Sequence, residues 1–288
     1  MTAIYKRELK SYFHSMIGYV FIAFLLAYTG IYFMVYNLNY GYPYFSYVLS
    51  SITFIYLLAI PVLTMRSFAE ERKNKTDQLL LTAPVSLFQI VMGKYLAMVT
   101  IMAAPCVVYL IFPLVIKAQG TAYILVDYLA ILVFFLFGCV CIAMGMFISS
   151  LTESQILAAI GTFAALLLVF LWSGILDFLP SSAGANVIGV CVLLTVCVLL
   201  IWRMTKNWLV CGGLEVLVIV GNLIAYLMKS EAYEGLLSEV LGKLNLVDVL
   251  SSITSNRLLD VSGVVRYLTI AVLFVFLTMQ MIQKRRWS

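Results

Sequence analysis

Long apolar stretches dominate this chain of 288 residues and restrict its fold more than any other feature. Hydrophobic residues make up 64% of the chain and charged residues 11%, against roughly a half and a quarter in globular domains. Eight stretches have about the 20 apolar residues that a helix needs to cross a bilayer. They cover residues 17–36, 48–65, 92–116, 128–149, 155–179, 187–203, 209–228 and 264–282. We therefore predict an all-α integral membrane protein, with a single transmembrane domain of about eight helices over residues 1–288 and no soluble domain.

Basic residues predict the orientation of these spans, because cytoplasmic loops collect Lys and Arg. With the N-terminus inside, 13 of the 18 basic residues fall on the cytoplasmic side. The five exceptions are Lys117, Lys229, Lys243, Arg257 and Arg266. Both termini are thus predicted to be cytoplasmic. The same bias explains the net charge of +5 and favours contact with anionic membrane lipids, so no nucleic-acid partner is expected.

Residues 1–16 carry the pattern of an amphipathic helix that lies in the membrane interface. Its apolar stripe consists of Tyr5, Leu9, Tyr12, Phe13 and Met16. Its polar side consists of Lys6, Arg7, Lys10 and His14. The alternative is a frayed, basic N-terminal tail.

Three features inside the spans are candidates for a functional role. Tyr28 and Tyr32 lie one turn apart in the first span, where they either anchor the outer interface or form a stacking wall for a substrate. Pro61 lies one turn before the cytoplasmic end of the second span and predicts a kink or hinge there. Glu215 is an acid inside a predicted span, which suggests a transport site unless that span begins later.

The small residues Ala158, Thr162 and Ala165 in the fifth span allow helix backbones to approach closely. That approach can occur within one chain or between two copies. Farther on, residues 229–263 form an extracellular amphipathic segment, which can lie on the outer leaflet, cap a pathway or dip back into the protein.

Several kinds of chemistry are missing from the sequence. It contains no GxxxxGK[ST] phosphate loop and no HExxH motif. Its six cysteines all fall in or at the ends of predicted spans, and His14 is the single histidine, so no metal site is expected. Ion-coupled carriers usually need more intramembrane charge than these spans hold. We expect no catalytic residues, no bound cofactor and no enzymatic activity in this chain.

One dense polar feature remains, the cytoplasmic loop of residues 66–91. Its charged residues are Arg66, Glu70, Glu71, Arg72, Lys73, Lys75 and Asp77. After them, Thr76 can cap a short helix of Leu79, Leu80 and Leu81 that Pro84 terminates. Ser86 and Gln89 then form a capping box for the third span. A short helix with three leucines would be exposed on a monomer and is typical of a docking element for another protein, although a solvated linker with its leucines on lipid is the alternative.

This loop also carries a family resemblance. The stretch EERKNKTDQLLLTAPVSLFQIVMGKYLA resembles the first cytoplasmic loop of ABC-2 type transporter permeases. The stretches YKRELKSYFHSMIGYVF and NRLLDVSGVVRYLTIAVLFVFLTMQMIQKRRW are similar to the N-terminal and final segments of that family's gliding-motility-like branch. The chain departs from the pattern at Lys75, where the family usually has Gly, and at Gln78, so the local turn is expected to differ. It also departs in having eight spans where six are usual, which makes 187–228 an added pair.

The resemblance implies a permease subunit with no catalytic chemistry of its own. Such a subunit pairs with itself or a relative, and with separate ABC ATPase subunits that bind ATP and Mg. The docking surface for the ATPase would comprise Glu70, Glu71, Arg72, Lys73, Thr76, Asp77, Leu79, Leu80, Leu81 and Pro84, together with the N-terminal interfacial helix. The substrate path would be bordered by 17–36, 48–65 and 155–179, and would include Tyr28, Tyr32 and Thr162. The resemblance thus implies an ATP-driven exporter in a bacterial cell membrane. The competing hypothesis is a non-transporting scaffold that recruits a cytoplasmic partner through the same loop.

Overall fold

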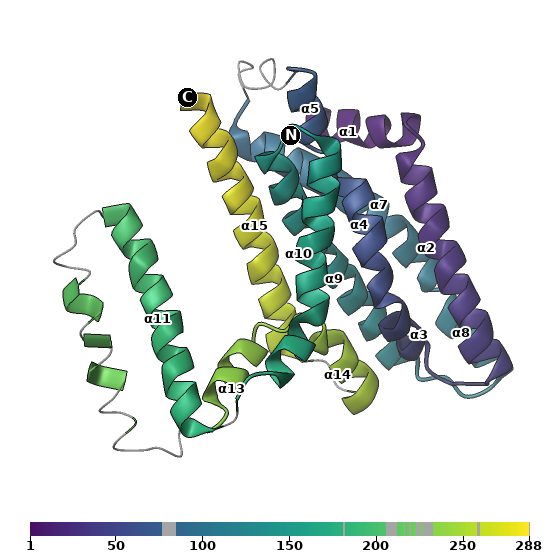
Figure 1. The fold of residues 1–288 in the computed structure, drawn as a ribbon. Helices are drawn as coiled ribbons and strands as arrows, with labels where there is room; N and C mark the ends of the chain where they lie inside the picture. The colour runs from purple at the N-terminus through teal and green to yellow at the C-terminus, as the bar shows by residue number, and fades with distance from the viewer. Residues whose placement is uncertain are drawn as a thin grey trace. The chain divides into compact units, whose positions relative to one another are not determined.

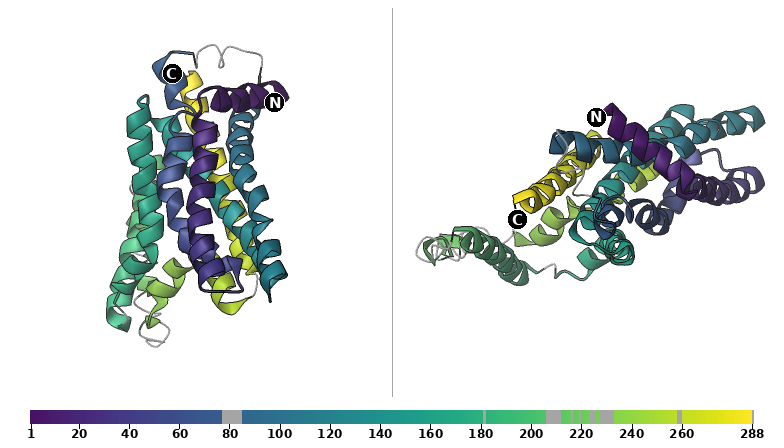
Figure 2. Two further views of the ribbon diagram at one scale, coloured as in Figure 1. Left: turned by 90° about the vertical axis from the view of Figure 1, so that its right-hand side faces the viewer. Right: turned by 90° about the horizontal axis from the view of Figure 1, so that it is seen from above.

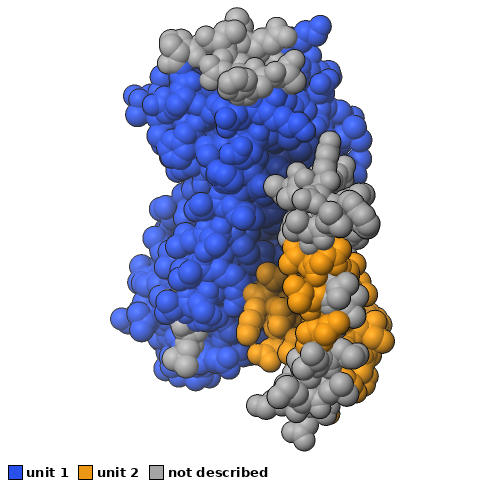
Figure 3. All heavy atoms as spheres, turned by 90° about the vertical axis from the view of Figure 1, so that its left-hand side faces the viewer, with its two compact units in different colours: residues 1–170, 246–288 blue, residues 171–245 orange. Residues whose placement is uncertain are grey.

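The computed structural model describes residues 1–76, 85–180, 182–205, 212–215, 217–218, 220–222, 226, 233–257 and 260–287. Throughout these residues the regular structure is helical (Figure 1). The chain divides into two compact units, one of Met1–Phe170 with Leu246–Ser288 and one of Leu171–Asn245 (Figure 3). The all-α membrane fold is therefore confirmed.

The first unit contains most of the helices. In chain order they are α1 (Thr2–His14), α2 (Ile17–Phe33), a π-helical extension (Met34–Asn39), α3 (Phe45–Ile52), a 3-10 turn (Thr53–Ile55), α4 (Tyr56–Thr64), α5 (Ala69–Lys73), α7 (Leu87–Tyr109), α8 (Phe112–Gln119), α9 (Ile124–Leu151), α10 (Gln155–Asp177), α14 (Asp248–Asn256) and α15 (Val261–Trp287). The last residues of α10 belong to the second unit.

Six apolar helices in the described part of the chain are long enough to cross a membrane. They are Ile17–Asn39, Phe45–Lys73, Leu87–Gln119, Ile124–Leu151, Gln155–Asp177 and Val261–Arg285. Each coincides with one of the predicted spans. The chain is a multi-pass membrane protein.

Helix α9 is the central helix of the first unit. It is apolar on all sides, the pattern of a buried helix, and its middle residues are almost completely buried. Helices α4, α7 and α15 pack around it. The rings of Phe137 and Tyr267 lie 5.7 Å apart, and those of Phe147 and Phe274 lie 5.8 Å apart, so aromatic pairs join α9 to α15 along much of their length.

Helix α10 returns antiparallel to α9 after a short turn, as the short loop between these spans predicts. Thr162 and Ala158 are fully buried, and a Cβ added to Gly145 would lie 2.9 Å from Cγ2 of Thr162. The small residues of the fifth span therefore permit close packing within one chain.

The second unit contains α11 (Ala183–Thr205) and α13 (Leu236–Gly242). The indole N–H of Trp172 donates to the carbonyl of Leu241 at 2.9 Å and ties the end of α10 to α13. Helix α11 coincides with the predicted span 187–203. Much of the predicted span 209–228 lies outside the described residues, so the count of eight spans stays a prediction. The described part of 229–263 forms two separate short helices, α13 and α14.

Both ends of the chain lie at the same end of the first unit (Figures 1 and 2). The guanidinium of Arg285 donates to the carbonyl of Leu151 at 3.4 Å, beside the turn between α9 and α10. This arrangement agrees with an even number of spans. That this end faces the cytoplasm stays a prediction from the distribution of Lys and Arg.

Candidate functional site

Helix α1 lies across the end of the bundle and packs against the first turns of α7 (Figure 2). The contact is close because α7 presents Gly93 to α1. A Cβ at Gly93 would lie 3.0 Å from Cγ2 of Ile4, so a larger residue would push the helices apart. The next residue, Lys94, is thereby brought within reach of the acidic residue one turn along α1.

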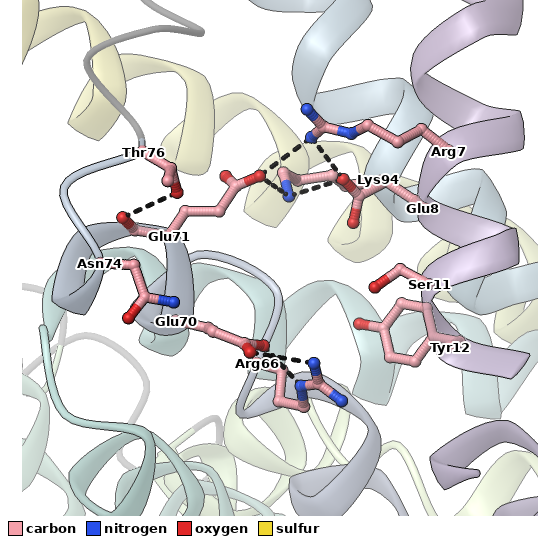
Figure 4. A pocket seen from close by; sticks show the side chains of 10 residues that line it. All are labelled: Arg7, Glu8, Ser11, Tyr12, Arg66, Glu70, Glu71, Asn74, Thr76 and Lys94. Carbon is pink, nitrogen blue, oxygen red and sulfur yellow. Dashed lines mark hydrogen bonds and ion pairs between the residues drawn. The ribbon is translucent and has the colours of Figure 1, made fainter. Parts of the chain in front are cut away.

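An ionic cluster joins α1, α5 and α7 at this point (Figure 4). The ammonium of Lys94 lies 3.1 Å from Oε1 of Glu8 and 2.9 Å from Oε1 of Glu71. The guanidinium of Arg7 contacts the same two carboxylates at 2.6 and 3.0 Å. Two cations and two anions therefore alternate, and we call Arg7, Glu8, Glu71 and Lys94 the ionic cluster.

Burial differs strongly among these four side chains. Lys94 is 2% exposed, Glu8 11%, Glu71 17% and Arg7 53%. The ammonium of Lys94 also lies 5.2 Å from the ring centroid of Phe68, a cation–π contact that adds to its attraction to the two carboxylates. Partial burial alone would lower the pKa of Arg7, but the hydrogen bond and charge of Glu8, with those of Glu71, raise it above its ordinary value. The cluster is electrically balanced, so removing one member leaves an uncompensated charge.

A second ion pair lies beside the cluster. Arg66 holds Glu70 with two nitrogens, Nε at 2.5 Å and an Nη at 2.9 Å. Between the two sets, the hydroxyl of Tyr12 donates to the carbonyl of Leu63 at 3.1 Å, and burial raises the pKa of this phenol. A polar cavity of about 340 Å³ separates the groups. It is lined by Arg7, Glu8, Ser11, Tyr12, Arg66, Glu70, Glu71, Asn74, Thr76 and Lys94 (Figure 4).

Helix α5 is also fixed to the far end of α9. The hydroxyl of Ser149 accepts from the backbone N–H groups of Phe68 and Ala69, each at 3.2 Å, and donates to the carbonyl of Met65. Arg72 reaches over the end of α9 and donates to the carbonyl of Thr152 at 3.2 Å. The start of the charged loop is thus bonded to α1 and α7 on one side and to the turn between α9 and α10 on the other.

Helix α5 ends in a Schellman motif that Lys75 completes. The N–H of Thr76 bonds to the carbonyl of Glu71 and that of Lys75 to the carbonyl of Arg72, at 2.9 and 3.0 Å. Lys75 adopts a left-handed conformation with φ of 55°, the conformation for which Gly is preferred at this position. The lysine thus adopts the backbone that a glycine would favour, and a difference from the family's turn stays a prediction.

Comparison with known families identifies the chain. Residues 33–201 match the model of the ABC-2 family transporter protein. The chain belongs to this family. No curated protein and no solved structure matches it significantly. Members of the family are membrane permease subunits of ABC transporters, which normally work with an ABC ATPase and usually reside in the bacterial cell membrane. The gliding-motility-like branch stays a prediction.

In this ABC-2 permease the predicted docking residues divide into two groups. Glu70, Glu71 and Arg72 turn toward the protein and make the ion pairs and hydrogen bonds above, whereas Lys73 is exposed. The hydroxyl of Thr76 donates to the carbonyl of Glu71 at 3.2 Å. Asp77, Leu79, Leu80, Leu81 and Pro84 lie outside the described residues. Beyond them, Ser86 caps α7 by accepting from the N–H of Gln89 at 3.3 Å, as the capping box predicts.

The interfacial helix of the permease is present as α1, but its faces differ from the prediction. The buried residues of α1 are Glu8 and Tyr12, whereas Met16, expected in the apolar stripe, is 71% exposed. Arg7, expected on the polar outer side, takes part in the ionic cluster. Met16 leaves the stripe because it adopts φ of 58° and starts the turn into α2.

The remaining residues of the predicted apolar stripe and polar face differ in burial. Tyr5, Leu9 and Phe13 are half-buried, and Lys6 and Lys10 are exposed. The hydroxyl of Tyr5 lies 3.0 Å from that of Thr100 on α7.

The other candidate residues of the permease lie as follows. The hydroxyl of Tyr28 donates to that of Tyr32 at 3.3 Å, with ring centroids 4.9 Å apart. Pro61 is buried inside α4, which continues to Thr64, and the change in helical geometry is the 3-10 turn Thr53–Ile55 before α4. Glu215 accepts from the hydroxyl of Thr195 at 2.6 Å. Their roles in a pathway or hinge stay predictions.

Glu8 and Lys94 are the functional candidates that sequence reasoning missed. Glu8 lies between Ile4 and Tyr12 at four-residue spacing, so it places an acid on an otherwise apolar face of α1. Lys94 follows Gly93 inside an apolar helix. A lone acid and a lone base at such positions are signals for a buried ion pair. Neither identifies its partner, because the two residues are far apart in the chain.

Proposed function

We propose that this permease is the membrane subunit of an ATP-driven exporter, in which a separate ATPase subunit docks on the loop of residues 66–91 and on α1. ATP and Mg would bind to the ATPase chain and not to this one. The observation that carries the proposal is the ionic cluster, since Glu71 of α5 is held by Lys94 of α7 and Arg7 of α1.

The cluster supports coupling because its four ion pairs hold α1, α5 and α7 together as one body. Residues 77–84 follow α5 directly and are where the partner is predicted to dock. A force on that loop reaches α5 and passes to α7 through Lys94 and to α1 through Arg7. Because Lys94 is 2% exposed, this contact is little screened by water or salt.

A second route connects the loop to the membrane-spanning helices. The hydroxyl of Ser149 bonds the turn before α5 to the end of α9, and Arg72 bonds α5 to Thr152. Helix α10 begins three residues later, at Gln155. A displacement of α5 would therefore move the ends of α9 and α10 together. We propose that α2, α3–α4 and α10 border the substrate path, with Tyr28, Tyr32 and Thr162 along it, in a homodimer or a heterodimer with a related permease.

Co-purification tests the docking. The permease is co-expressed with a candidate ABC ATPase from the same genome, and the ATPase that remains bound after affinity purification is quantified. The triple variant Leu79→Ser, Leu80→Ser, Leu81→Ser removes the predicted docking residues without touching the ionic cluster. Lys117→Gln, an exposed cation at the end of α8, is the control.

We expect the triple variant to co-purify with about tenfold less ATPase than the wild type, and Lys117→Gln to co-purify with the same amount as the wild type. Undiminished binding by the triple variant would refute docking at this loop. The scaffold hypothesis predicts binding without transport, so ATP-dependent flux in reconstituted vesicles separates it from the proposal.

A further inference from the structure

A second cavity lies at the elbow between α1 and α2, away from the ionic cluster. It has a volume of about 610 Å³ and is lined by Lys6, Leu9, Lys10, Phe13, His14 and Tyr19. The elbow forms because α1 ends at His14 and α2 begins at Ile17, with Met16 in a left-handed conformation between them. Helix α1 crosses the ends of the spans and meets α2 at this elbow (Figure 1). With α1 in the membrane interface, as its sequence predicts, the cavity would lie where the first span leaves the membrane.

One wall of the cavity is cationic and unpaired. Lys6 and Lys10 lie one helical turn apart on the same face of α1, and both are exposed. Neither has an ion pair within the described residues. His14 continues the row, with Nδ1 3.2 Å from the carbonyl of Lys10. The neighbouring acids, Glu8 and Glu71, are already held by Arg7 and Lys94, so no carboxylate among the described residues neutralises this wall.

The other wall is apolar and aromatic. The rings of Phe13 and Tyr19 meet edge to face with centroids 5.0 Å apart. Leu9 also lines the cavity. Cations beside an apolar floor, at the boundary where a span enters the membrane, match a ligand with a phosphate and an attached hydrocarbon part.

We propose that the elbow of α1 and α2 binds one anionic phospholipid, with its phosphate at Lys6 and Lys10 and its glycerol and upper acyl chain against Phe13 and Tyr19. A zwitterionic phosphatidylcholine fits less well because its choline cation would be repelled by the lysines. This site lies outside the docking loop of residues 66–91 and shares only α1 with the proposed ATPase contact. Its argument uses the cavity, the lysines and the aromatic rings alone, so the proposal does not rest on the exporter assignment.

Native mass spectrometry of the full-length protein tests the site. The protein in detergent is titrated with dioleoyl phosphatidylglycerol, with dioleoyl phosphatidylcholine, and with phosphatidylglycerol in the presence of excess inorganic phosphate. The test variant is Lys6→Gln, Lys10→Gln. The control variant, Lys117→Gln, Lys243→Gln, loses the same charge from two exposed lysines elsewhere. Gel filtration and a thermal unfolding curve confirm that both variants are folded.

We expect one phosphatidylglycerol to bind tightly to the wild type and the control, and roughly tenfold to thirtyfold more weakly to the test variant. Phosphatidylcholine should bind the wild type about as weakly as phosphatidylglycerol binds the test variant. Equal phosphatidylglycerol binding by both variants would overturn the site. Complete displacement of the lipid by inorganic phosphate would also overturn it, because the apolar wall would then contribute nothing.

Discussion

Replacing Lys94 by methionine is the sharpest test of the ionic cluster. Methionine keeps an unbranched side chain of similar length and removes the buried cation of the cluster. Glu8 and Glu71, 11% and 17% exposed, would then share only Arg7, which is 53% exposed. An exposed pair of this kind contributes about 0–1 kcal/mol, too little to compensate two nearly buried carboxylates.

The expected loss of stability follows from this imbalance. Removing one partner of a buried ion pair typically costs about 3–5 kcal/mol, because the remaining charge is left without compensation. Since both carboxylates keep some contact with water, we expect Lys94→Met to lower the free energy of unfolding by about 3 kcal/mol. The triple variant Lys94→Met, Glu8→Gln, Glu71→Gln removes all three charges and should recover most of this loss, because replacing a whole buried group costs far less than breaking it.

Equilibrium unfolding in mixed detergent and SDS micelles provides the measurement. Lys73→Met is the matched control, since Lys73 is an exposed lysine on α5 and its replacement should change the free energy of unfolding by less than about 0.5 kcal/mol. If Lys94→Met falls within the same range as Lys73→Met, the cluster does not hold α1, α5 and α7 together. If the triple variant is no more stable than Lys94→Met, the loss comes from packing and not from uncompensated charge.

Three further predictions concern local structure, each measured as a change in the free energy of unfolding. Lys75→Gly should stabilise the protein by about 1 kcal/mol, because glycine adopts the left-handed backbone of Lys75 without the penalty of a side chain; a loss would show that the lysine side chain matters more than its backbone. Asp127 accepts the N–H of Ser46 at 2.9 Å at the start of α3, and its other oxygen has no hydrogen-bond partner within the described residues. Asp127→Ala should therefore cost about 1–2 kcal/mol and Asp127→Asn much less, and equal losses would contradict a capping role. Gly145→Ala should cost about 1–3 kcal/mol, since the added methyl would collide with the side chain of Thr64 on α4 and lie 2.9 Å from Cγ2 of Thr162 on α10. Gly174→Ala, with open space around it, should be neutral or stabilising, and equal effects of the two would refute the close packing of α9 against α4 and α10.

The membrane-spanning helices could be predicted from the sequence because hydropathy is a local property. Each of the six spans in the described residues follows from an apolar run and the charges at its ends. The cap at Ser86 is equally local, since its partner Gln89 lies three residues away. The start of α7 was therefore predicted in detail, although its span was placed a few residues too late.

The ionic cluster could not be predicted in this way, because its members lie in three different parts of the chain. From the sequence, Glu71 is predicted to belong to the cytoplasmic docking loop and Arg7 to the polar face of an interfacial helix. Their partners became apparent only when α1 crossed α7 at Gly93 and brought Lys94 beside both carboxylates. The left-handed turn at Lys75 was missed for a related reason: residue preference argued against it, and the hydrogen bonds that end α5 outweigh that preference.

Helix α1 separates its charges by direction, so the ionic cluster and the lipid site use different side chains of the same helix. Adjacent residues on a helix point about 100° apart, so Arg7 reaches Glu71 while Lys6 faces the open elbow. Dissolved salt weakens the interactions of buried charges little. The electrostatic attraction of the exposed lysines for an anion, in contrast, decays over roughly 8 Å at physiological ionic strength. Raising the salt concentration should therefore weaken lipid binding at Lys6 and Lys10 and leave the free energy of Lys94 pairing nearly unchanged. A parallel loss of both would mean that α1 responds as one electrostatic surface, and that the cluster is more open to water than its side-chain burial indicates.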